Sequence, residues 1–200
     1  MLLENIATIR TGVVATRKKA VENAPKINEY KLLNLKCAAS AGYLDLQYAE
    51  TFMTVDLLKP EYFTQMDDIL VRLSAPYTAI MITREDWCHY LVPSHFAIIR
   101  VDKTVASPEY ILWILKREST RQKILQNISG SGAFGTISSK FFSTLSIGDL
   151  PLSKQQLIGE MQVLSEKELE LLHKLTVQKE IYNKLLVNKI YDSVKRGNQK

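Results

Sequence analysis

Cysteine, long apolar runs and export signals are scarce in this sequence of 200 residues. Its two cysteines, Cys37 and Cys88, are too few for the disulfide framework of a small secreted domain and fit a reducing compartment. The apolar runs are short, whereas a membrane-spanning helix needs about 20 mostly apolar residues. Residues 1–5 also lack the basic segment that opens a signal peptide. We therefore expect a cytoplasmic protein with no membrane partner.

Motifs for catalysis and cofactor binding are also missing. Residues 130–135 match the G-x-G-x-x-G spacing of dinucleotide sites, but that motif needs a strand before it and a helix after it. Here a helical pattern precedes the glycines and polar residues follow them. The glycines are more typical of a backbone with positive φ, either in a plain linker or in a loop that lies on a ligand. Residues 74–77 (S-A-P-Y) fall one residue short of an amino-methyltransferase signature, and no glycine-rich cofactor loop precedes them.

Metal and nucleophile sites are not indicated either. Cys88 and His89 are adjacent, which does not match ordinary zinc spacing. Glu29 and Lys31 form the E-x-K triplet of some nucleases, but with 21 acidic and 26 basic residues such triplets arise by chance. No arrangement of Ser, His and Asp or of Cys and His stands out. The sequence therefore predicts a binding module that is not an enzyme and has neither a cofactor nor a metal site.

Proline and glycine are absent between Gly159 and Gly197. Residues 153–156 (S-K-Q-Q) form a capping box, which is typical of the start of a helix. The sequence therefore predicts one helix from residue 153 to about residue 195. About 40 residues at 1.5 Å per residue extend for roughly 60 Å, which is far more than a globular domain of this size requires.

Apolar residues recur along this helix at alternating spacings of four and three, which is a heptad pattern. Seven of the ten seam positions are apolar. The other three are Glu168, Gln178 and Lys189, which weaken a pure coiled coil but can set its register. The predicted dimerisation residues are Leu157, Met161, Leu164, Leu171, Leu175, Tyr182 and Leu185.

Two interpretations of this seam are open. Either the helix is a spacer that pairs with a partner helix and fixes the distance between two domains, or it folds back on its own domain. A second apolar row beside the seam favours more than one neighbour, or a broad one. This row consists of Ile158, Leu172, Ile181, Leu186 and Ile190. We favour the spacer.

The residues before the helix predict a mixed domain. Strand patterns occur at residues 5–10, 30–36, 68–73, 78–83 and 95–101. Ser107, Pro108 and Glu109 predict the start of a helix, because Ser caps it, Pro fits its first turn and Glu complements its dipole. A second helical pattern continues through Leu125. We therefore predict an α+β fold, with one domain at residues 1–152 and a long helix at residues 153–200.

The net charge of +5 is distributed unevenly along the chain. Residues 10–36 contain seven basic and two acidic residues, residues 37–71 contain one basic and six acidic, and residues 100–140 contain seven basic and three acidic. A chain whose positive charge collects in separate segments can present one basic side to a polyanion. Chance clustering on a solvated surface gives the same pattern, so composition alone does not decide between them.

Five short segments, residues 3–12, 68–72, 108–115, 130–132 and 147–158, come in an order that resembles that of the specificity (S) subunits of type I restriction-modification systems. In that family a target recognition domain ends in I-P-L-P-x-L-x-x-Q-x-x-I and enters a long spacer helix, and residues 147–158 (IGDLPLSKQQLI) are similar. The other similar segments are residues 3–12, 68–72, 108–115 and 130–132. Asp67, Gly148 and Asp149 depart from the pattern where Gly and Pro are usual, which affects turn geometry.

The resemblance implies a half-subunit, because family members hold two recognition domains and two spacer helices in a chain about twice this length. Two copies would pair their C-terminal helices in an antiparallel coiled coil with two-fold symmetry. Each recognition domain would then read one half of a split, palindromic site in double-stranded DNA. The dimer would deliver DNA to methyltransferase (modification) and motor-nuclease (restriction) subunits without cutting or methylating it.

The resemblance also directs attention to residues whose chemistry suits DNA. Basic groups, small polar groups and backbone amides suit phosphates, and polar side chains in the major groove suit base edges. The phosphate candidates are Arg17, Lys18, Lys19, Gly130, Ser131, Gly132 and Lys140, and the base-edge candidates are Arg72, Tyr77, Thr78, Ser94 and Thr136. Two alternatives stay open: the DNA-recognition subunit of another bipartite methyltransferase system, and a helical scaffold that binds a protein partner and no DNA.

Overall fold

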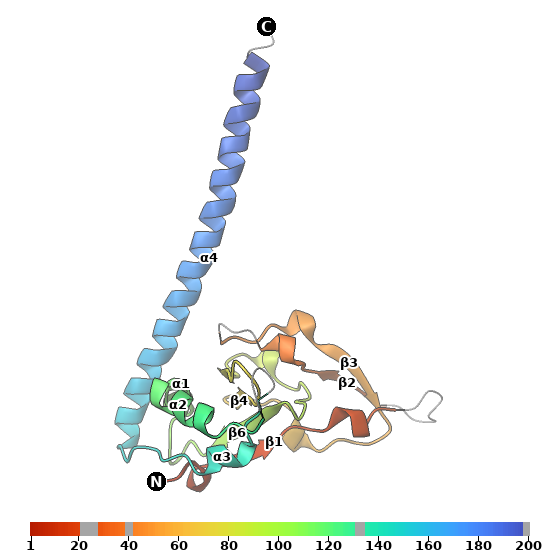
Figure 1. The fold of residues 1–200 in the computed structure, drawn as a ribbon, viewed down its shortest axis with the longest axis vertical. Coiled ribbons are helices and arrows are strands. Elements are labelled where there is room, and N and C mark those ends of the chain that lie inside the picture. The colour runs from red at the N-terminus through yellow and green to blue at the C-terminus, as the bar shows by residue number, and fades with distance from the viewer. Residues whose placement is uncertain (21–27, 39–41, 131–134, 198–200) are drawn as a thin grey trace. The chain divides into compact units, whose positions relative to one another are not determined.

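The computed structural model of the protein describes residues 1–20, 28–38, 42–130 and 135–197 (Figure 1). The chain divides into two compact units, Met1–Gly159 and Glu160–Lys200. The division falls inside the long helix α4 (Leu152–Gly197), so the first two turns of that helix belong to the first unit. The predicted assignment of residues 1–152 to DNA recognition and 153–200 to dimerisation is a functional one and stays a prediction.

A four-stranded antiparallel sheet forms the centre of the first unit. It consists of β1 (Ala7–Thr11), β6 (Phe96–Val101), β4 (Ile69–Arg72) and β5 (Ala79–Met81), in that order. Every residue of β5, and all but one of β4 and of β6, is buried. Such continuous burial explains why these strands read as apolar runs without alternation, since both of their faces are covered.

The sheet has a core on each side. Leu70, Ile80 and Ile98 are neighbours in the register of β5, β4 and β6, and they pack with Leu33 and Val92 in one cluster. The residues between them in each strand point to the other face. Besides the start of α4, the described residues of this unit form the helices α1 (Pro108–Lys116), α2 (Glu118–Gln126) and α3 (Ser139–Ser143). Of these, α1 contacts β5 and β6, and α3 contacts β1.

A two-stranded ribbon, β2 (Asn28–Leu32) paired with β3 (Glu50–Thr54), is the second sheet of the unit. In Figure 1 this ribbon and the helices α1–α3 lie on opposite sides of the four-stranded sheet. A smaller apolar cluster of Val13, Phe52, Leu58 and Leu91 joins the ribbon to the loop before β6. The ring centroids of Tyr30 and Phe63 are 5.1 Å apart at its edge.

The expected α+β fold is confirmed, and so are most of its elements. Ser107 caps α1 as predicted, because its hydroxyl accepts a hydrogen bond from the Tyr110 amide at 3.3 Å. The strand expected at residues 5–10 begins only at Ala7, after a 3-10 turn. The strand expected at 30–36 ends at Leu32, because the Asn34 side chain caps a 3-10 turn there. The sequence patterns did not predict β3 or α3.

The long C-terminal helix is also confirmed. It runs for 46 residues, from Leu152 to Gly197, or about 69 Å at 1.5 Å per residue. The predicted capping box is wrong, since the helix begins one residue before Ser153 and the Pro151 carbonyl accepts hydrogen bonds from Lys154 and Gln155. Within the described residues, no helix is both long enough and apolar enough to cross a membrane.

Candidate nucleic-acid interface and helix seam

One end of the four-stranded sheet brings together segments that are far apart in sequence. Because the sheet is antiparallel, β1 and β4 end there while β5 and β6 begin there. Arg72 is the last residue of β4, Thr78 directly precedes β5, and Ser94 lies two residues before β6. Gly12 follows β1, where an added Cβ would lie 2.3 Å from the Val92 carbonyl oxygen. The close approach of these backbones therefore requires glycine at residue 12.

The turn between β4 and β5 presents two of the predicted base-reading side chains. Its backbone closes with a 2.9 Å hydrogen bond from the Tyr77 amide to the Ser74 carbonyl, after a cis peptide between Ala75 and Pro76. The Arg72 guanidinium donates to the Ser74 hydroxyl at 3.3 Å. Arg72 and Tyr77 are half-buried, so each side chain is supported by the fold and still reaches solvent.

The loop after α2 lies against this turn. Ser129 and Thr136 exchange two backbone hydrogen bonds of 2.9 and 3.0 Å, and the Ile137 amide donates to the Leu73 carbonyl at 2.9 Å. The Tyr77 hydroxyl donates to the Gly135 carbonyl, also at 2.9 Å. These bonds place Gly130 and Thr136 beside the β4–β5 turn, and both are exposed. Of the other predicted loop residues, Ser131 and Gly132 lie outside the described part of the chain.

Two more candidates adjoin the same end of the sheet. The Thr11 and Ser139 hydroxyls are 2.7 Å apart, which joins the end of β1 to α3 and to the exposed Lys140 next in sequence. The Ser94 amide donates to the Val13 carbonyl at 2.8 Å. The structure thus gathers seven of the predicted residues at one end of the sheet: Arg72, Tyr77, Thr78, Ser94, Gly130, Thr136 and Lys140.

The basic triplet Arg17, Lys18 and Lys19 lies elsewhere, beside the β2–β3 ribbon. Its position is fixed by a 2.8 Å hydrogen bond from the Ala20 amide to the Met53 carbonyl of β3. The Lys18 ammonium pairs with the Asp56 carboxylate at 2.7 Å. All three side chains are exposed, but the charge of Lys18 is partly compensated by this acidic neighbour.

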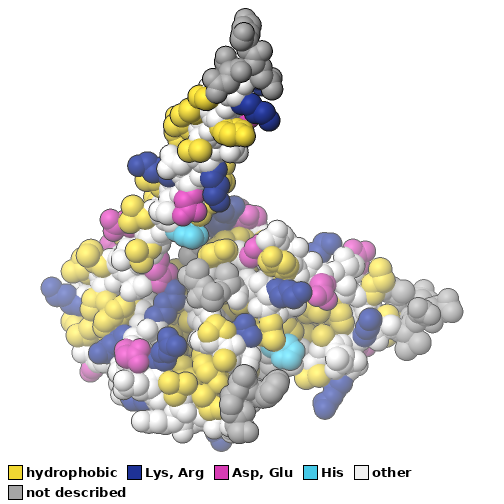
Figure 2. Space-filling view, turned by 45° about the horizontal axis from the view of Figure 1, so that its top comes forward, with side chains coloured by type: hydrophobic (Ala, Val, Ile, Leu, Met, Phe, Trp, Pro, Cys, Tyr) yellow, Lys and Arg dark blue, Asp and Glu magenta, His cyan; other side chains and the backbone are white. Residues whose placement is uncertain are grey.

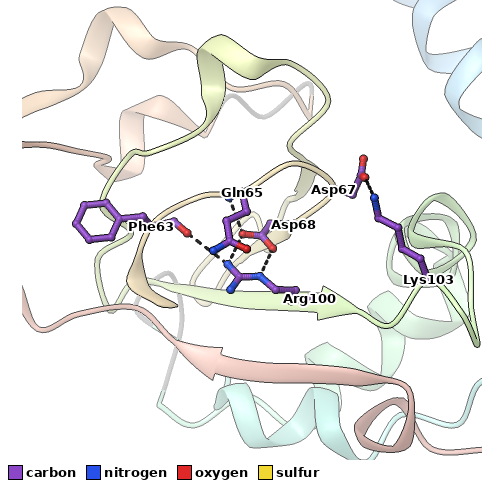
Figure 3. Close-up of polar contacts among 6 residues, drawn as sticks. All are labelled: Phe63, Gln65, Asp67, Asp68, Arg100 and Lys103. Carbon is purple, nitrogen blue, oxygen red and sulfur yellow. Dashed lines mark hydrogen bonds and ion pairs between the residues drawn. The ribbon is translucent and has the colours of Figure 1, made fainter. Parts of the chain in front are cut away.

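A buried ion pair at the opposite end of the sheet was not predicted from sequence. The Asp68 carboxylate is fully buried and accepts two hydrogen bonds from Arg100, at 2.6 and 2.7 Å, and a third from the Gln65 amide at 2.8 Å (Figure 3). The hydrogen bonds that Arg100 donates to the Asp68 carboxylate raise the pKa of Arg100. Next to it, an ion pair with Asp67 raises the pKa of Lys103. Asp68 belongs to a family-like motif, but nothing in that motif identifies its partner, 32 residues later.

The predicted dimerisation residues lie on α4, and all seven side chains are exposed in the single chain. Their exposed fractions range from 53% for Leu171 to 65% for Leu164. Figure 2 shows hydrophobic side chains on the surface of this helix, between basic and acidic ones. The second row is exposed as well, at Leu172, Ile181, Leu186 and Ile190. An apolar seam of this length in water favours association with another apolar surface.

The described residues contain no group of three His, Cys, Asp or Glu side chains placed to hold a metal ion. The sheet end offers hydrogen-bonding groups and positive charge, and α4 offers an apolar seam.

Comparison with known proteins gives similarity in fold. No protein-family model and no curated protein sequence matches the chain. Two solved structures reach a TM-score of 0.60 over 93% of this chain: one from a study of complex assembly and conformational transition of the type I R-M system, at 14% identity, and the HsdS subunit from Thermoanaerobacter tengcongensis, at 11%. The type I restriction-modification S subunit from M. genitalium reaches 0.53 over 88% of this chain, at 14% identity.

The chain spans less than half the length of these structures, 42%, 46% and 40% of them in the same order. At such low identity the likeness establishes the fold, and it confirms at that level the resemblance to type I specificity subunits.

Proposed function

We propose that the protein is a DNA-binding specificity half-subunit of a type I restriction-modification system. In this proposal the first unit reads one half of a bipartite double-stranded DNA site. The helix α4 joins two copies, and the dimer recruits methyltransferase and restriction subunits in the cytoplasm. The chain itself catalyses no reaction and uses no cofactor.

The observation that carries this proposal is the combination of coverage and length. Nearly the whole chain, 93% of it, matches two of the solved structures, whereas it accounts for only 42% and 46% of theirs. By the family resemblance a specificity subunit holds two recognition domains and two spacer helices, and these 200 residues correspond to one of each. In our proposal a second copy supplies the other pair, because closed two-fold dimers are the commonest oligomers.

The exposed seam supports pairing through α4. A fully buried Leu side chain contributes about 1.5–3 kcal/mol relative to an exposed one, so seven seam residues per copy favour association strongly. An antiparallel arrangement puts the two recognition domains at opposite ends of the helix pair. Such a symmetric dimer would read a palindromic site in two halves, separated by a gap that the helix length sets.

The sheet end is the proposed reading surface. Arg72, Tyr77, Thr78, Ser94 and Thr136 supply hydrogen-bonding groups for base edges, on turns that backbone hydrogen bonds hold in place. Lys140 and Gly130 lie at the same end of the sheet and suit phosphates, and we propose the same role for Ser131 and Gly132, which follow Gly130 in the sequence. Arg17, Lys18 and Lys19 would extend the phosphate contacts along the ribbon.

Solution mass and DNA selection test the proposal together. Light scattering after gel filtration should give about 45 kDa, twice the chain mass of 22.8 kDa. Selection from random duplexes should enrich two inverted copies of one short sequence at a fixed gap. A 22.8-kDa species would contradict the homodimer. If that species gained mass only after a full-length specificity chain was added, the dimer would consist of one copy of each chain.

The same measurements separate the alternatives. Failure to retard any duplex at micromolar protein and low salt would favour a helical scaffold without a DNA role. DNA selection without binding to type I modification and restriction subunits would favour another bipartite methyltransferase system. The partner experiment uses purified subunits, so that each outcome is assigned to one protein.

A further inference from the structure

The first turn of α4 carries a buried polar side chain. Gln155 is only 1% exposed, and both ends of its amide are satisfied. Its Oε1 accepts a hydrogen bond from the Ser107 amide at 3.2 Å, and its Nε2 donates to the Leu150 carbonyl at 2.9 Å. Ser107 is the N-cap of α1. One side chain therefore joins the start of α4 to the start of α1.

One turn later, Gly159 brings the two helices into backbone contact. A Cβ added there would lie 2.6 Å from the Glu109 Cβ and 2.8 Å from the Tyr110 amide nitrogen, distances that real Cβ atoms essentially never show. Residues four apart lie on the same face of a helix, so Gln155 and Gly159 act on the same side of α4. The first turn of α1 therefore meets α4 at two consecutive turns.

These contacts define one register, in a way that an apolar patch does not. Rotating or sliding α4 on α1 would separate the buried Ser107 N–H from the Gln155 amide oxygen, and a buried N–H is costly to leave unsatisfied. The same movement would bring a side-chain-bearing residue against the Glu109 backbone, where only glycine fits. Apolar contacts alone would tolerate small shifts, because they are not directional.

We infer that Gln155 and Gly159 are positioning residues that make DNA binding selective for the number of base pairs between two half-sites. The inference rests on the proposed function and deepens it. Because α4 continues without interruption from these residues to Gly197, its start is where the direction of the helix is set. One extra base pair moves a half-site by about 3.4 Å and turns it by roughly 35°, so a loosened start should tolerate gaps that the native one rejects.

The test uses the full-length protein and a set of duplexes. Selection with the wild-type protein first identifies the half-site and its gap. Affinity is then measured for that half-site alone, and for paired half-sites whose gap is shortened or lengthened by one and two base pairs. We expect the wild-type protein to prefer one gap by about tenfold or more, because only that gap lets both domains bind together.

Gln155→Met removes both hydrogen bonds at similar size, and Gly159→Ala adds the Cβ that does not fit. Each should reduce the gap preference to about threefold or less while affinity for a single half-site stays unchanged. The matched controls are Gln156→Met, an exposed neighbour, and Ser165→Ala, an exposed position of the same helix. Both controls should keep the wild-type gap preference.

The outcomes separate this inference from the proposed function. If the wild-type protein enriches no sequence, the proposed function fails before any variant is measured. If it enriches a split site and both variants keep the wild-type gap preference, only the positioning role is overturned. Two further outcomes would also overturn the positioning role, because they would assign the two residues to stability alone. One is an equal loss of affinity at all gaps and at the single half-site. The other is failure of both variants to fold, as judged by circular dichroism.

Discussion

The two units of this chain use apolar residues in opposite ways. In Met1–Gly159 the apolar side chains of β4, β5 and β6 are buried within one chain. In Glu160–Lys200 the apolar side chains lie on a single helix and are mostly exposed. The first unit therefore draws its stability from its own core. The second has only local helix contacts within a single chain, and an isolated helix is only marginally stable in water, so its stability should depend on the proposed pairing.

This contrast means that similar substitutions should have different consequences in the two units. Removing an interaction in the first unit should lower the free energy of unfolding and leave association unchanged. Removing one in the second unit should weaken association and leave the unfolding of the first unit unchanged.

The largest effect is expected on the seam of α4. Leu171→Lys combined with Leu175→Lys places two charges per copy in the proposed interface and removes two leucines from it. Because each buried leucine contributes about 1.5–3 kcal/mol, the dimer dissociation constant should rise by about four orders of magnitude or more. Light scattering should then give a 22.8-kDa species with an unchanged unfolding transition of the first unit.

The control for the seam is a variant with the same added charge on the opposite face. His173→Lys combined with Glu180→Gln also adds two positive charges per copy. These two residues lie five positions after the seam residues Glu168 and Leu175, and therefore on the other side of the helix. It should remain at about 45 kDa, twice 22.8 kDa. A seam variant that also remained at 45 kDa would place the interface elsewhere.

The next effect is expected at the buried ion pair of the first unit. Arg100→Ala leaves the fully buried Asp68 carboxylate without its guanidinium. Breaking a buried pair costs about 3–5 kcal/mol, and the lower end applies here because the Arg100 side chain is 31% exposed. Urea unfolding should show a loss of about 3 kcal/mol, with the solution mass unchanged.

The exposed pair of Arg84 and Asp86 provides the control for this comparison. It has the same two-bond geometry, at 2.8 Å for each bond, but both side chains are more than half exposed. Asp86→Asn should therefore cost less than about 1 kcal/mol. Equal losses in Arg100→Ala and Asp86→Asn would show that burial does not strengthen the first pair.

The elements of the first unit could be predicted only where the chain signals them locally. The strands β4, β5 and β6 could be predicted, because burial on both faces gives a continuous apolar run in the sequence. The Ser107 cap could be predicted too, because capping depends on residues that are neighbours in the sequence. The strand β3 could not, since Glu50–Thr54 has little apolar character and is held by pairing with β2. The start of α4 was placed one residue late, because Ser153 and Gln156 have the spacing of a capping box, whereas the helix begins at Leu152 and its first turn bonds to the Pro151 carbonyl.

The candidate site shows the same division. Residue chemistry and family resemblance selected polar groups, but they could not tell that Arg72, Ser94 and Thr136 share one end of the sheet. That proximity comes from strand order, which no local pattern encodes. Nor could they tell that Lys18 is paired with Asp56. The long helix α4 and its exposed apolar row could be predicted, because a helix outside the core shows its apolar residues as a simple period. That this row is an interface stays a prediction.

A smaller effect is expected from the basic triplet of the first unit. Lys18→Ala combined with Lys19→Ala should weaken binding to all duplexes alike, and should reduce the slope of log affinity against log salt by up to about two. Lys103→Ala, at the opposite end of the sheet and paired with Asp67, is the control and should leave the slope unchanged. An unaltered slope in the double variant would remove Lys18 and Lys19 from the interface.

The smallest effect concerns the local contacts of the second unit. Hydrogen bonds from Lys174 and Lys167 lower the pKa of Glu170. A carboxyl whose pKa is lower in the folded state stabilises that state above its unfolded pKa, and this contribution disappears as pH falls through the folded pKa. The groups are exposed, so the contribution is only about a few tenths of a kcal/mol.

Glu170→Gln should remove this pH dependence from α4. Between pH 7 and pH 3 the wild-type helix should lose more stability than the variant, measured by circular dichroism of thermal unfolding at several pH values. Glu180→Gln, on the same helix, is the matched control and should follow the wild-type curve. Parallel curves for Glu170→Gln and the wild-type protein would mean that the two lysines do not stabilise the helix. Its stability would then depend to a still greater degree on the proposed covering of the seam by a second copy.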